Sequence, residues 1–360
     1  MPHREEDEVS RTAPREFTPE AYPEFPSGLP TVDLETISLA KLLGPDSNDE
    51  RNRVFKACKG RGFFYLELGG CEAGDTILHG ADRLIGSVGE ELFALPLDEK
   101  MSYHLTGGSL DGYKSVGLTF TDKARTPDTA EFFNVGKNEM IVPDNQMKKR
   151  WPDVIKTAKP LFREYMCTAH DIGMQILSIL AVKLGVDEAE FACRHRIEEQ
   201  SGDIVRLTRG PPRDKEEMPE IQTPSHTDFG TITILMNWLG GLQVWSESAR
   251  KAQLHNSEPD SPGEWLWVRP KKGCAIINLG DAAVKFTNGV LCSGRHRAPG
   301  AQSKFHRYSL VYFVRPEDNC IMKQLRASAI PDGPEEEQII TAREWIKAQA
   351  EGLGTRWQDN

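Results

Sequence analysis

Hydrophobic and polar positions follow different periods in different parts of the chain. From Pro160 to Gly185 the apolar residues recur about every 3.6 positions, which predicts one long helix with an apolar face. The run ends in Lys183-Leu-Gly185, and a basic residue followed by glycine is a typical helix stop. We expect this helix to support a β-sheet rather than to bind a cofactor.

Short apolar runs bounded by Gly and Pro dominate the chain from residue 204 to residue 314. The expected strands are 204–207, 231–236, 242–245, 266–269, 275–279, 284–286 and 308–314. So many short antiparallel strands predict a sandwich or a jelly roll, with ligand-binding side chains on inward positions near one mouth. The predicted fold class is α+β, a double-stranded β-helix core (jelly roll, cupin-like) flanked by helices.

The same patterns divide the chain into four segments of one integrated fold. Residues 1–28 are rich in charge and proline, which predicts a poorly ordered acidic arm. Residues 29–200 form an N-terminal α/β region that includes the long helix. Residues 201–316 form the jelly-roll core, and residues 317–360 form a C-terminal helical segment.

Local signals predict shorter helices and one long loop. The helices are expected at 52–59, 77–93 and 341–350. Capping boxes of the form Ser/Thr-x-x-Glu support the last two, at Ser87 with Glu90 and at Thr341 with Glu344. The polar stretch 246–264 predicts a surface loop, in which His255 is exposed and binds no metal.

Composition narrows the class of protein. A chain of 360 residues with 27% charged and 38% hydrophobic residues is typical of a globular protein. Its net charge of -10 argues against a nucleic-acid surface, and no apolar run approaches the ~20 residues of a membrane span. The seven cysteines contain no Cys-x-x-Cys pair, which predicts reduced thiols in a cytoplasmic protein. Nothing in the sequence predicts the oligomeric state.

Three side chains in the strand-rich region form a candidate metal site. His226 and Asp228 stand in Thr223-Pro-Ser-His-Thr-Asp, and alternate residues of a strand point to the same side. A second histidine, His296, follows after enough chain for several antiparallel strands. Two imidazoles and one carboxylate on one face of an octahedral ion are the ligand set of non-haem Fe(II) oxygenases, whose opposite face stays open.

A second pair of polar residues lies beyond the later histidine. Arg307 and Ser309, again two positions apart, lead into the apolar run 310–314. A guanidinium binds a carboxylate through two parallel hydrogen bonds. The pair is therefore a candidate anchor for the distal carboxylate of a keto-diacid whose other end chelates iron. The alternative for Arg307 alone is an exposed cation at a strand end.

With these residues the chain resembles the isopenicillin N synthase-like family of 2-oxoglutarate and Fe(II)-dependent dioxygenases, from about residue 29 to about residue 316. The resemblance implies iron at His226, Asp228 and His296, and 2-oxoglutarate at Arg307 and Ser309. Other matching segments are Pro30-Thr-Val-Asp-Leu34, Cys58-Lys-Gly-Arg-Gly-Phe-Phe-Tyr-Leu66, Phe93-Ala-Leu-Pro-Leu-Asp-Glu-Lys100, Gly241-Leu-Gln-Val-Trp245 and Asn278-Leu-Gly-Asp281.

One segment departs from the family pattern. Many relatives have an Asn-Tyr-Tyr-Pro run ahead of the His-x-Asp, whose polar groups help to hold 2-oxoglutarate, and here the aligned stretch is Arg206-Leu-Thr-Arg-Gly-Pro211. Thr208 offers a hydroxyl where the Asn would stand, whereas Gly210 has no side chain to replace a phenol. Arg209 either supplies the missing contact or binds an acidic substrate; a solvated arginine is the alternative.

Residues for the organic substrate are harder to assign. The stretch 101–150 is irregular and rich in Gly, Thr and Asp, and it is a candidate lid with Phe132, Phe133 or Asn134 directed inward. Burial in the core is the alternative for these aromatic residues. Phe229, next to a proposed iron ligand, is a further candidate.

The resemblance implies a reaction in which O2 and 2-oxoglutarate are co-substrates and succinate and CO2 are released. A C–H bond of a small metabolite would be oxidised, by hydroxylation, desaturation or ring formation, in secondary metabolism. Two alternatives stay open: an iron oxidase or cyclase that needs no 2-oxoglutarate, and an inactive ligand-binding relative.

Overall fold

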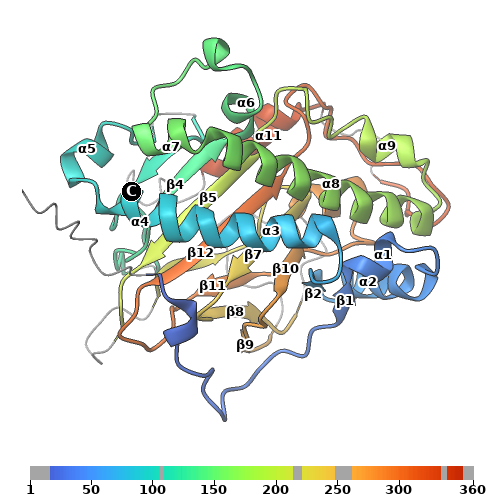
Figure 1. The fold of residues 1–360 in the computed structure, drawn as a ribbon. Coiled ribbons are helices and arrows are strands. Elements are labelled where there is room, and N and C mark those ends of the chain that lie inside the picture. The colour runs from blue at the N-terminus through green and yellow to red at the C-terminus, as the bar shows by residue number, and fades with distance from the viewer. Residues whose placement is uncertain are drawn as a thin grey trace, which may run out of the picture.

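Two β-sheets and a layer of helices build the protein (Figure 1). The computed structural model describes residues 17–105, 109–122, 124–213, 221–247, 262–333 and 339–351. The large sheet has eight strands in the order β1-β2-β10-β7-β12-β5-β4-β3, and the small sheet has four in the order β6-β11-β8-β9. Neighbouring strands are antiparallel, except that β1 runs parallel to β2. Two facing sheets flanked by helices confirm the predicted jelly-roll class.

The strand bounds follow. They are β1(Thr36–Ser38), β2(Phe63–Glu67), β3(Gly112–Lys114), β4(Glu131–Gly136), β5(Ile204–Gly210), β6(Thr223–His226), β7(Ile232–Asn237), β8(Leu242–Trp245), β9(Trp265–Val268), β10(Cys274–Leu279), β11(His296–Ala298) and β12(Arg307–Val314).

The helices lie mainly in the first half of the described chain. They are the 3-10 turns η1(Pro19–Ala21) and η3(Asp144–Gln146), the π-helical segment η2(Leu84–Gly89), and the α-helices α1(Leu39–Leu43), α2(Asn48–Gly60), α3(Glu72–Arg83), α4(Glu90–Ala94), α5(Leu97–Met101), α6(Lys137–Met140), α7(Asp153–Thr157), α8(Lys159–Leu184), α9(Glu188–Ala192), α10(Asp281–Phe286) and α11(Ala342–Glu351).

Both faces of the large sheet are buried. We call the face toward the small sheet the inner face; there a cluster of apolar residues from β2, β7 and β10 packs against β8 and β9. The opposite, outer face packs against helices, with α8 in contact with β7 and β12 and with α3 alongside it (Figure 1). Burial on both faces explains why β7 and β12 are apolar at successive as well as alternate positions.

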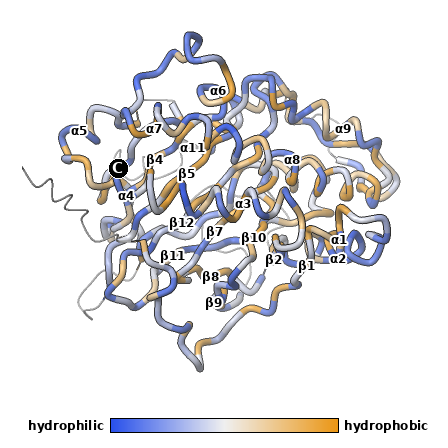
Figure 2. The backbone as a smooth tube through the Cα atoms, viewed as in Figure 1, coloured by the Kyte–Doolittle hydropathy of each residue, from blue (hydrophilic) through white to orange (hydrophobic). Residues whose placement is uncertain are grey.

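Helix α8 is the central helix of the core. By length and composition alone it could cross a membrane, yet 61% of its most apolar stretch is buried inside the protein. Figure 2 shows hydrophobic stretches along α8 and along the strands of the large sheet. The helix ends at Gly185, whose φ of 69° is the left-handed conformation of a glycine cap. The structure therefore confirms the predicted 160–185 helix and its stop.

The N-terminal region and the jelly roll share one sheet. Strands β1 and β2 extend the large sheet beyond β10, and β3 and β4 extend it beyond β5 at the other edge. Because these edge strands pair with jelly-roll strands through backbone hydrogen bonds, the two regions form one continuous core.

Most of the predicted elements are present, but the strand expected at 284–286 is wrong. These residues belong to α10, which starts after Gly280 and contains Ala282 and Ala283, both good helix formers. Val284 and Phe286, the apolar residues that suggest a strand, lie on the buried side of this short helix.

The two capping boxes have different outcomes. Thr341 and Glu344 form theirs: the Glu344 carboxylate accepts from the Thr341 N–H at 2.9 Å, and the Thr341 hydroxyl accepts from the Glu344 N–H at 3.2 Å. The box at Ser87 and Glu90 is wrong, because α3, η2 and α4 run on without a break from residue 72 to residue 94. Ser87 therefore lies inside a helical segment and caps nothing.

Part of the predicted arm is packed against the fold. Phe17 is buried and meets Trp238 and Tyr308 edge to face, with ring centroids 4.9 and 5.8 Å apart. The expectation of a poorly ordered arm is thus wrong for residues 17–28, because an aromatic anchor holds the start of this segment; residues 1–16 lie outside the described part. Most of the predicted 246–264 loop, with His255, also lies outside it.

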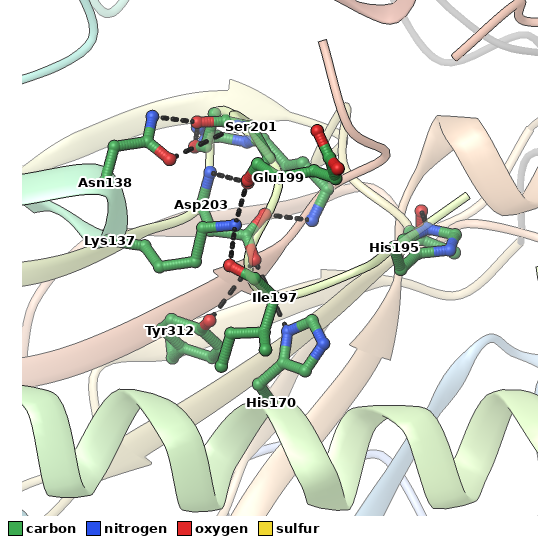
Figure 3. A network of polar contacts seen from close by, with 12 residues as sticks. Lys137, Asn138, His170, His195, Ile197, Glu199, Ser201, Asp203 and Tyr312 are labelled. Carbon is green, nitrogen blue, oxygen red and sulfur yellow. Dashed lines mark hydrogen bonds and ion pairs between the residues drawn. The ribbon is translucent and has the colours of Figure 1, made fainter. Parts of the chain in front are cut away.

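A buried polar network joins the helices to the outer face of the large sheet (Figure 3). Asp203, just before β5, accepts from the Tyr312 hydroxyl at 3.2 Å and from the Arg315 N–H at 2.7 Å. His170 of α8 lies 3.5 Å from the same carboxylate. Lys137 donates to the carbonyl oxygens of Ile197 and Glu199 at 2.9 and 2.8 Å.

Candidate metal centre

His226, Asp228 and His296 come together at one end of the small sheet. One carboxylate oxygen of Asp228 lies 3.7 Å from Nε2 of His226 and 3.9 Å from Nε2 of His296. One ligand atom from each of the three residues lies within 4.8 Å of the others. An ion about 2.1 Å from each donor can bridge separations of up to about 4.2 Å, so one metal ion can reach Asp228 and either histidine together.

Strand pairing brings the two histidines together. His296 of β11 is directly opposite His226 of β6, and their ring centroids lie 4.2 Å apart. Nδ1 of His226 is 2.8 Å from the carbonyl oxygen of Pro224, and Nδ1 of His296 is 3.1 Å from that of Gly294. Because a carbonyl only accepts, each Nδ1 carries the proton, and each Nε2 presents a lone pair to the shared space.

Two donors hold the carboxylate of Asp228. Its other oxygen accepts from the Thr233 hydroxyl at 2.6 Å and from the Asn278 amide at 2.7 Å, on β7 and β10 of the large sheet. One oxygen is therefore occupied by the protein, and the other is left to face the histidines. This arrangement favours coordination through a single carboxylate oxygen.

Asp281 ties together the two segments that carry the ligands. Its buried carboxylate accepts from the hydroxyls of Thr227 at 3.0 Å and Ser293 at 2.6 Å. Gly280 permits this close approach, because an added Cβ would stand 2.3 Å from the carbonyl oxygen of Gly230. The resemblance of Asn278-Leu-Gly-Asp281 to the family thus has a structural meaning: Asn278 fixes one ligand and Asp281 positions the segments of all three.

The electrostatics of the site suit a divalent cation. Burial, together with the neighbouring His296, lowers the pKa of His226 to about 3, so its imidazole is neutral at physiological pH. Burial alone would raise the pKa of Asp228, but the two histidines and the hydrogen bonds from Thr233 and Asn278 hold it well below its usual range. Two imidazoles and one carboxylate fit the donor set of a non-haem Fe(II) centre.

Arg307 and Ser309 lie at the start of β12 on the inner face, opposite Gly210 and Thr208 of β5. Ser309 pairs in register with Thr208, and all three side chains are buried. Nε of Arg307 donates to the carbonyl oxygen of Gly240 at 2.6 Å. Among the described residues no carboxylate pairs with Arg307, and burial lowers its pKa to about 10, which leaves it charged at neutral pH. A buried cation without an acidic partner is costly unless a ligand supplies the anion.

The expectations for Arg209 and Phe133 are wrong, because both residues lie on the outer face. Arg209 pairs with Glu131 at 2.7 Å, and Phe133 is fully buried with its ring 4.9 Å from that of Tyr113. Side chains alternate along a strand, so the neighbours of these residues are the ones that face the metal. The side chain of Arg209 therefore lies on the face opposite to the candidate metal centre.

Phe229 lies on the same side of the large sheet as the candidate metal centre. It is buried, and the Arg315 guanidinium lies 4.7 Å from its ring centroid. Arg206 and Arg315 are two residues of this face that the sequence analysis does not single out. The Arg206 guanidinium lies 4.1 Å from the ring centroid of Phe132. The available signal was parity: Arg206 and Thr208 are two positions apart in one strand and so share a face.

Comparison with known proteins identifies the class. Residues 201–316 match the 2OG-Fe(II) oxygenase superfamily, and residues 29–154 match the N-terminal region described as "non-haem dioxygenase in morphine synthesis". A 2-oxoglutarate-dependent dioxygenase of Aspergillus fumigatus is 34% identical over 85% of this chain and 81% of its own length. Another, from Dothideomycetidae sp., is 29% identical over 87% of this chain and 88% of its own.

Solved structures share the fold. A full-length Neurospora crassa protein, solved in complex with alpha-KG and thymine, superposes with a TM-score of 0.69 at 20% identity, over 90% of this chain and 97% of that one. A putative 2OG-Fe(II) oxygenase family protein of Caulobacter crescentus gives a TM-score of 0.68 at 24% identity, over 89% and 99%.

The chain belongs to the 2OG-Fe(II) oxygenase superfamily. It is an oxidoreductase, a dioxygenase that uses Fe(II) with 2-oxoglutarate and O2 as co-substrates.

Proposed function

We propose that His226, Asp228 and His296 hold the iron, and that Arg307, Ser309 and Thr208 hold the distal carboxylate of 2-oxoglutarate. The observation that carries this proposal is the pairing of two features on one inner face. Three donor atoms lie within 4.8 Å of each other with lone pairs directed together, and nearby a buried arginine has no acidic partner among the described residues. The first feature requires a cation and the second requires an anion, and iron(II) with 2-oxoglutarate supplies both.

The organic substrate is a small metabolite oxidised at an unactivated C–H bond, by hydroxylation, desaturation or ring formation. Bound iron, with 2-oxoglutarate and O2, supplies the oxidising power for that step. The chain supplies orientation: Thr233 and Asn278 turn one oxygen of Asp228 toward the metal, and the two backbone carbonyls accept from Nδ1–H of each imidazole, so that each ring is held with Nε2 toward the metal. Apolar surroundings between the sheets keep bulk water away from the reacting groups.

The relatives support a role in secondary metabolism. They include fungal 2-oxoglutarate-dependent dioxygenases and, among plant proteins, a flavonoid 7-O-demethylase of Ocimum basilicum that is 29% identical over 88% of this chain. Their names differ, so they define no single substrate. A cytoplasmic location is consistent with seven cysteines that are all free thiols.

Arg307 gives the most direct test of the anchor. The Arg307→Gln variant should raise the Kd for 2-oxoglutarate by roughly tenfold or more, because a buried charged hydrogen bond contributes about 1.5–3 kcal/mol. Isothermal titration of the anaerobic, iron-loaded protein measures this Kd, and the iron content checks that the metal site is intact.

Arg209→Gln is the matched control, since this arginine lies nearby in the fold but on the outer face. It should leave the Kd for 2-oxoglutarate unchanged. If Arg307→Gln bound 2-oxoglutarate as tightly as the wild type, Arg307 would not be the anchor.

A further inference from the structure

Two arginines in addition to Arg307 face the candidate metal centre from the large sheet. Arg206 of β5 is directly opposite Val311 of β12, and Arg315 follows β12 two positions after Phe313. Phe313 is in turn opposite Thr233, the residue that donates to Asp228. Residues opposite each other, and alternate residues along a strand, share one face of a sheet. Both arginines therefore lie on the inner face, the face that Asp228 contacts through Thr233 and Asn278.

Aromatic rings hold both guanidinium groups. That of Arg206 lies 4.1 Å from the ring centroid of Phe132 and 5.1 Å from that of Phe313. That of Arg315 lies 4.9 Å from the same Phe313 ring and 4.7 Å from Phe229. A guanidinium stacked on aromatic faces is restricted in orientation but keeps its N–H groups free to donate at the edge.

Most of the hydrogen-bond donors on these groups are not used by the protein. A guanidinium has five N–H bonds. Arg206 donates from Nε to the Asn134 side chain at 2.8 Å, and Arg315 donates from one terminal nitrogen to the carbonyl oxygen of Gly202. Among the described residues, the buried Nε of Arg315 has no acceptor. Within the described ranges, neither guanidinium forms an ion pair with a carboxylate.

Nearby carboxylates balance the positive charges of Arg206 and Arg315 only in part. Burial lowers the pKa of Arg206 and of Arg315 to about 10, so both are charged at neutral pH. Three carboxylates, those of Asp203, Asp228 and Asp111, lie near Arg315. Near Arg206 there is that of Asp228, whose charge would be neutralised by a bound metal ion. Arg206 is therefore the less compensated of the two cations.

This pair is separate from the proposed anchor for 2-oxoglutarate. Val311, opposite Arg206, lies four positions along β12 from Arg307, and Arg315 lies eight positions away. At about 3.3 Å per residue these offsets are roughly 13 and 26 Å between backbone positions. With the distal carboxylate of 2-oxoglutarate at Arg307 and its other end on the iron, Arg206 and Arg315 are left for a different anionic group.

We propose that Arg206, with Arg315 beside it, binds the carboxylate of the organic substrate, so that the enzyme oxidises a small organic acid. The inference rests on the proposed function of the same site. Asn134 is a positioning residue, because its side-chain oxygen fixes the Nε side of Arg206 and leaves the terminal nitrogens for the ligand. Two or three charge-assisted hydrogen bonds would then orient the acid over the metal-facing surface.

The test compares acids with their neutral amides. The probes are benzoate, phenylacetate and cinnamate, each paired with its primary amide, titrated calorimetrically into anaerobic protein loaded with Fe(II) and 2-oxoglutarate. In the wild type at least one acid should bind about tenfold more tightly than its amide, which corresponds to one charged hydrogen bond. Arg206→Gln should abolish this preference, and Arg206→Lys should retain part of it.

Two controls keep the outcome interpretable. Arg209→Gln changes an arginine of the same strand on the outer face, and should keep the full preference for acids. If Arg206→Gln does not fold, Arg315→Gln takes its place and should reduce the preference.

Equal binding of every acid and its amide by the wild type, or no binding at all, would overturn the proposal. So would an Arg206→Gln variant that lost affinity for 2-oxoglutarate and kept the preference for acids. Failure of the underlying function looks different: the wild type would then fail to bind 2-oxoglutarate in the presence of Fe(II), whatever the probes did.

Discussion

Two buried aspartates on opposite faces of the same sheet show what separates a metal site from an ordinary polar core. On the outer face, the Asp203 carboxylate accepts hydrogen bonds from the Tyr312 hydroxyl and the Arg315 backbone N–H, with His170 3.5 Å away (Figure 3). On the inner face, one oxygen of Asp228 meets two imidazole nitrogens at 3.7 and 3.9 Å.

The two aspartates differ in whether the N–H and O–H groups around them point toward the carboxylate or away from it. At Asp228 both imidazoles donate from Nδ1 to backbone carbonyls, so that lone pairs of nitrogen and oxygen face one another. Such an arrangement is repulsive until a cation occupies the centre. At Asp203 the Tyr312 hydroxyl and the Arg315 backbone N–H both donate to the carboxylate, so its charge is stabilised without any ligand. Carboxylate and imidazole side chains thus form a structural support on one face and a binding site on the other.

The largest expected effect comes from removing one imidazole of the inner site. His226→Ala should bind no iron and lose at least about a hundredfold in 2-oxoglutarate turnover, because even residues behind the ligands are worth 10–100-fold. His170→Ala on the outer face should keep its iron. Metal analysis of both purified variants, with turnover measured by succinate release, makes the comparison. Equal iron contents in the two variants would remove the distinction between the faces.

Removing the carboxylate of Asp203 on the outer face should affect stability and not iron binding. Asp203→Ala leaves His170 and the charge of Lys137 without their buried acid, and should lower the free energy of unfolding by about 3 kcal/mol or more. Asp228→Asn in metal-free protein should change the same free energy by less, because the side-chain oxygen of Asn can still accept the hydrogen bonds from Thr233 and Asn278. Urea unfolding followed by circular dichroism measures both values. The reverse order would contradict the comparison.

A smaller effect on iron binding is expected from the residues that hydrogen-bond to Asp228. Asn278→Ala removes one of the two donors that orient Asp228, and should raise the Kd for Fe(II) by about 10–100-fold. Asn138→Ala removes an amide of similar size from the outer network, where it donates to the Ser201 carbonyl at 2.8 Å. This variant should bind Fe(II) as the wild type does. Competition with a metal-sensitive chelator under anaerobic conditions measures the two constants.

The smallest effect is a dependence of stability on pH from His195. Burial lowers its pKa from 6.5 to about 4, with Nε2 2.7 Å from the Thr231 hydroxyl. Between these two pH values the unfolded chain takes up a proton that the folded protein does not, so stability falls as the pH falls from about 6.5 toward about 4.

At pH 5 this contribution is about 2 kcal/mol. Urea unfolding of metal-free protein at pH 7 and pH 5 measures it, and the loss between the two should be smaller by about that amount in His195→Gln. An unchanged loss in the variant would show that His195 already titrates normally in the folded state.

The sequence predicts those parts of the site that depend on residues close together in the chain, and it predicts less well those that depend on contacts between distant segments. The spacing of His226 and Asp228, and of Arg307 and Ser309, is a local property of a strand, so period-two reasoning placed each pair on one face. His296 is a candidate because it lies in the same strand-rich region, and the family pattern supports it, but its pairing with His226 across seventy residues leaves no local signal. The jelly roll followed from many short apolar runs, which are also local.

The errors have a common physical origin in the register of neighbouring strands. Nothing local to Arg209 and Phe133 shows that 131–136 forms a strand whose odd positions lie on the outer face, so the inward orientation expected of both is wrong. Arg206 and Phe132, which have the opposite parity in their strands, face the metal instead. Phe17 was placed in an unstructured arm because its partners Trp238 and Tyr308 lie more than two hundred residues away.

The most direct test of the whole account is an anaerobic titration of the protein with Fe(II) and 2-oxoglutarate, watched for the weak visible charge-transfer band of the complex. The wild type should develop the band at one equivalent of each, His226→Ala should show none, and Arg307→Gln should require a much higher concentration of 2-oxoglutarate. A wild type that takes up Fe(II) but shows no band at any concentration of 2-oxoglutarate would contradict the account.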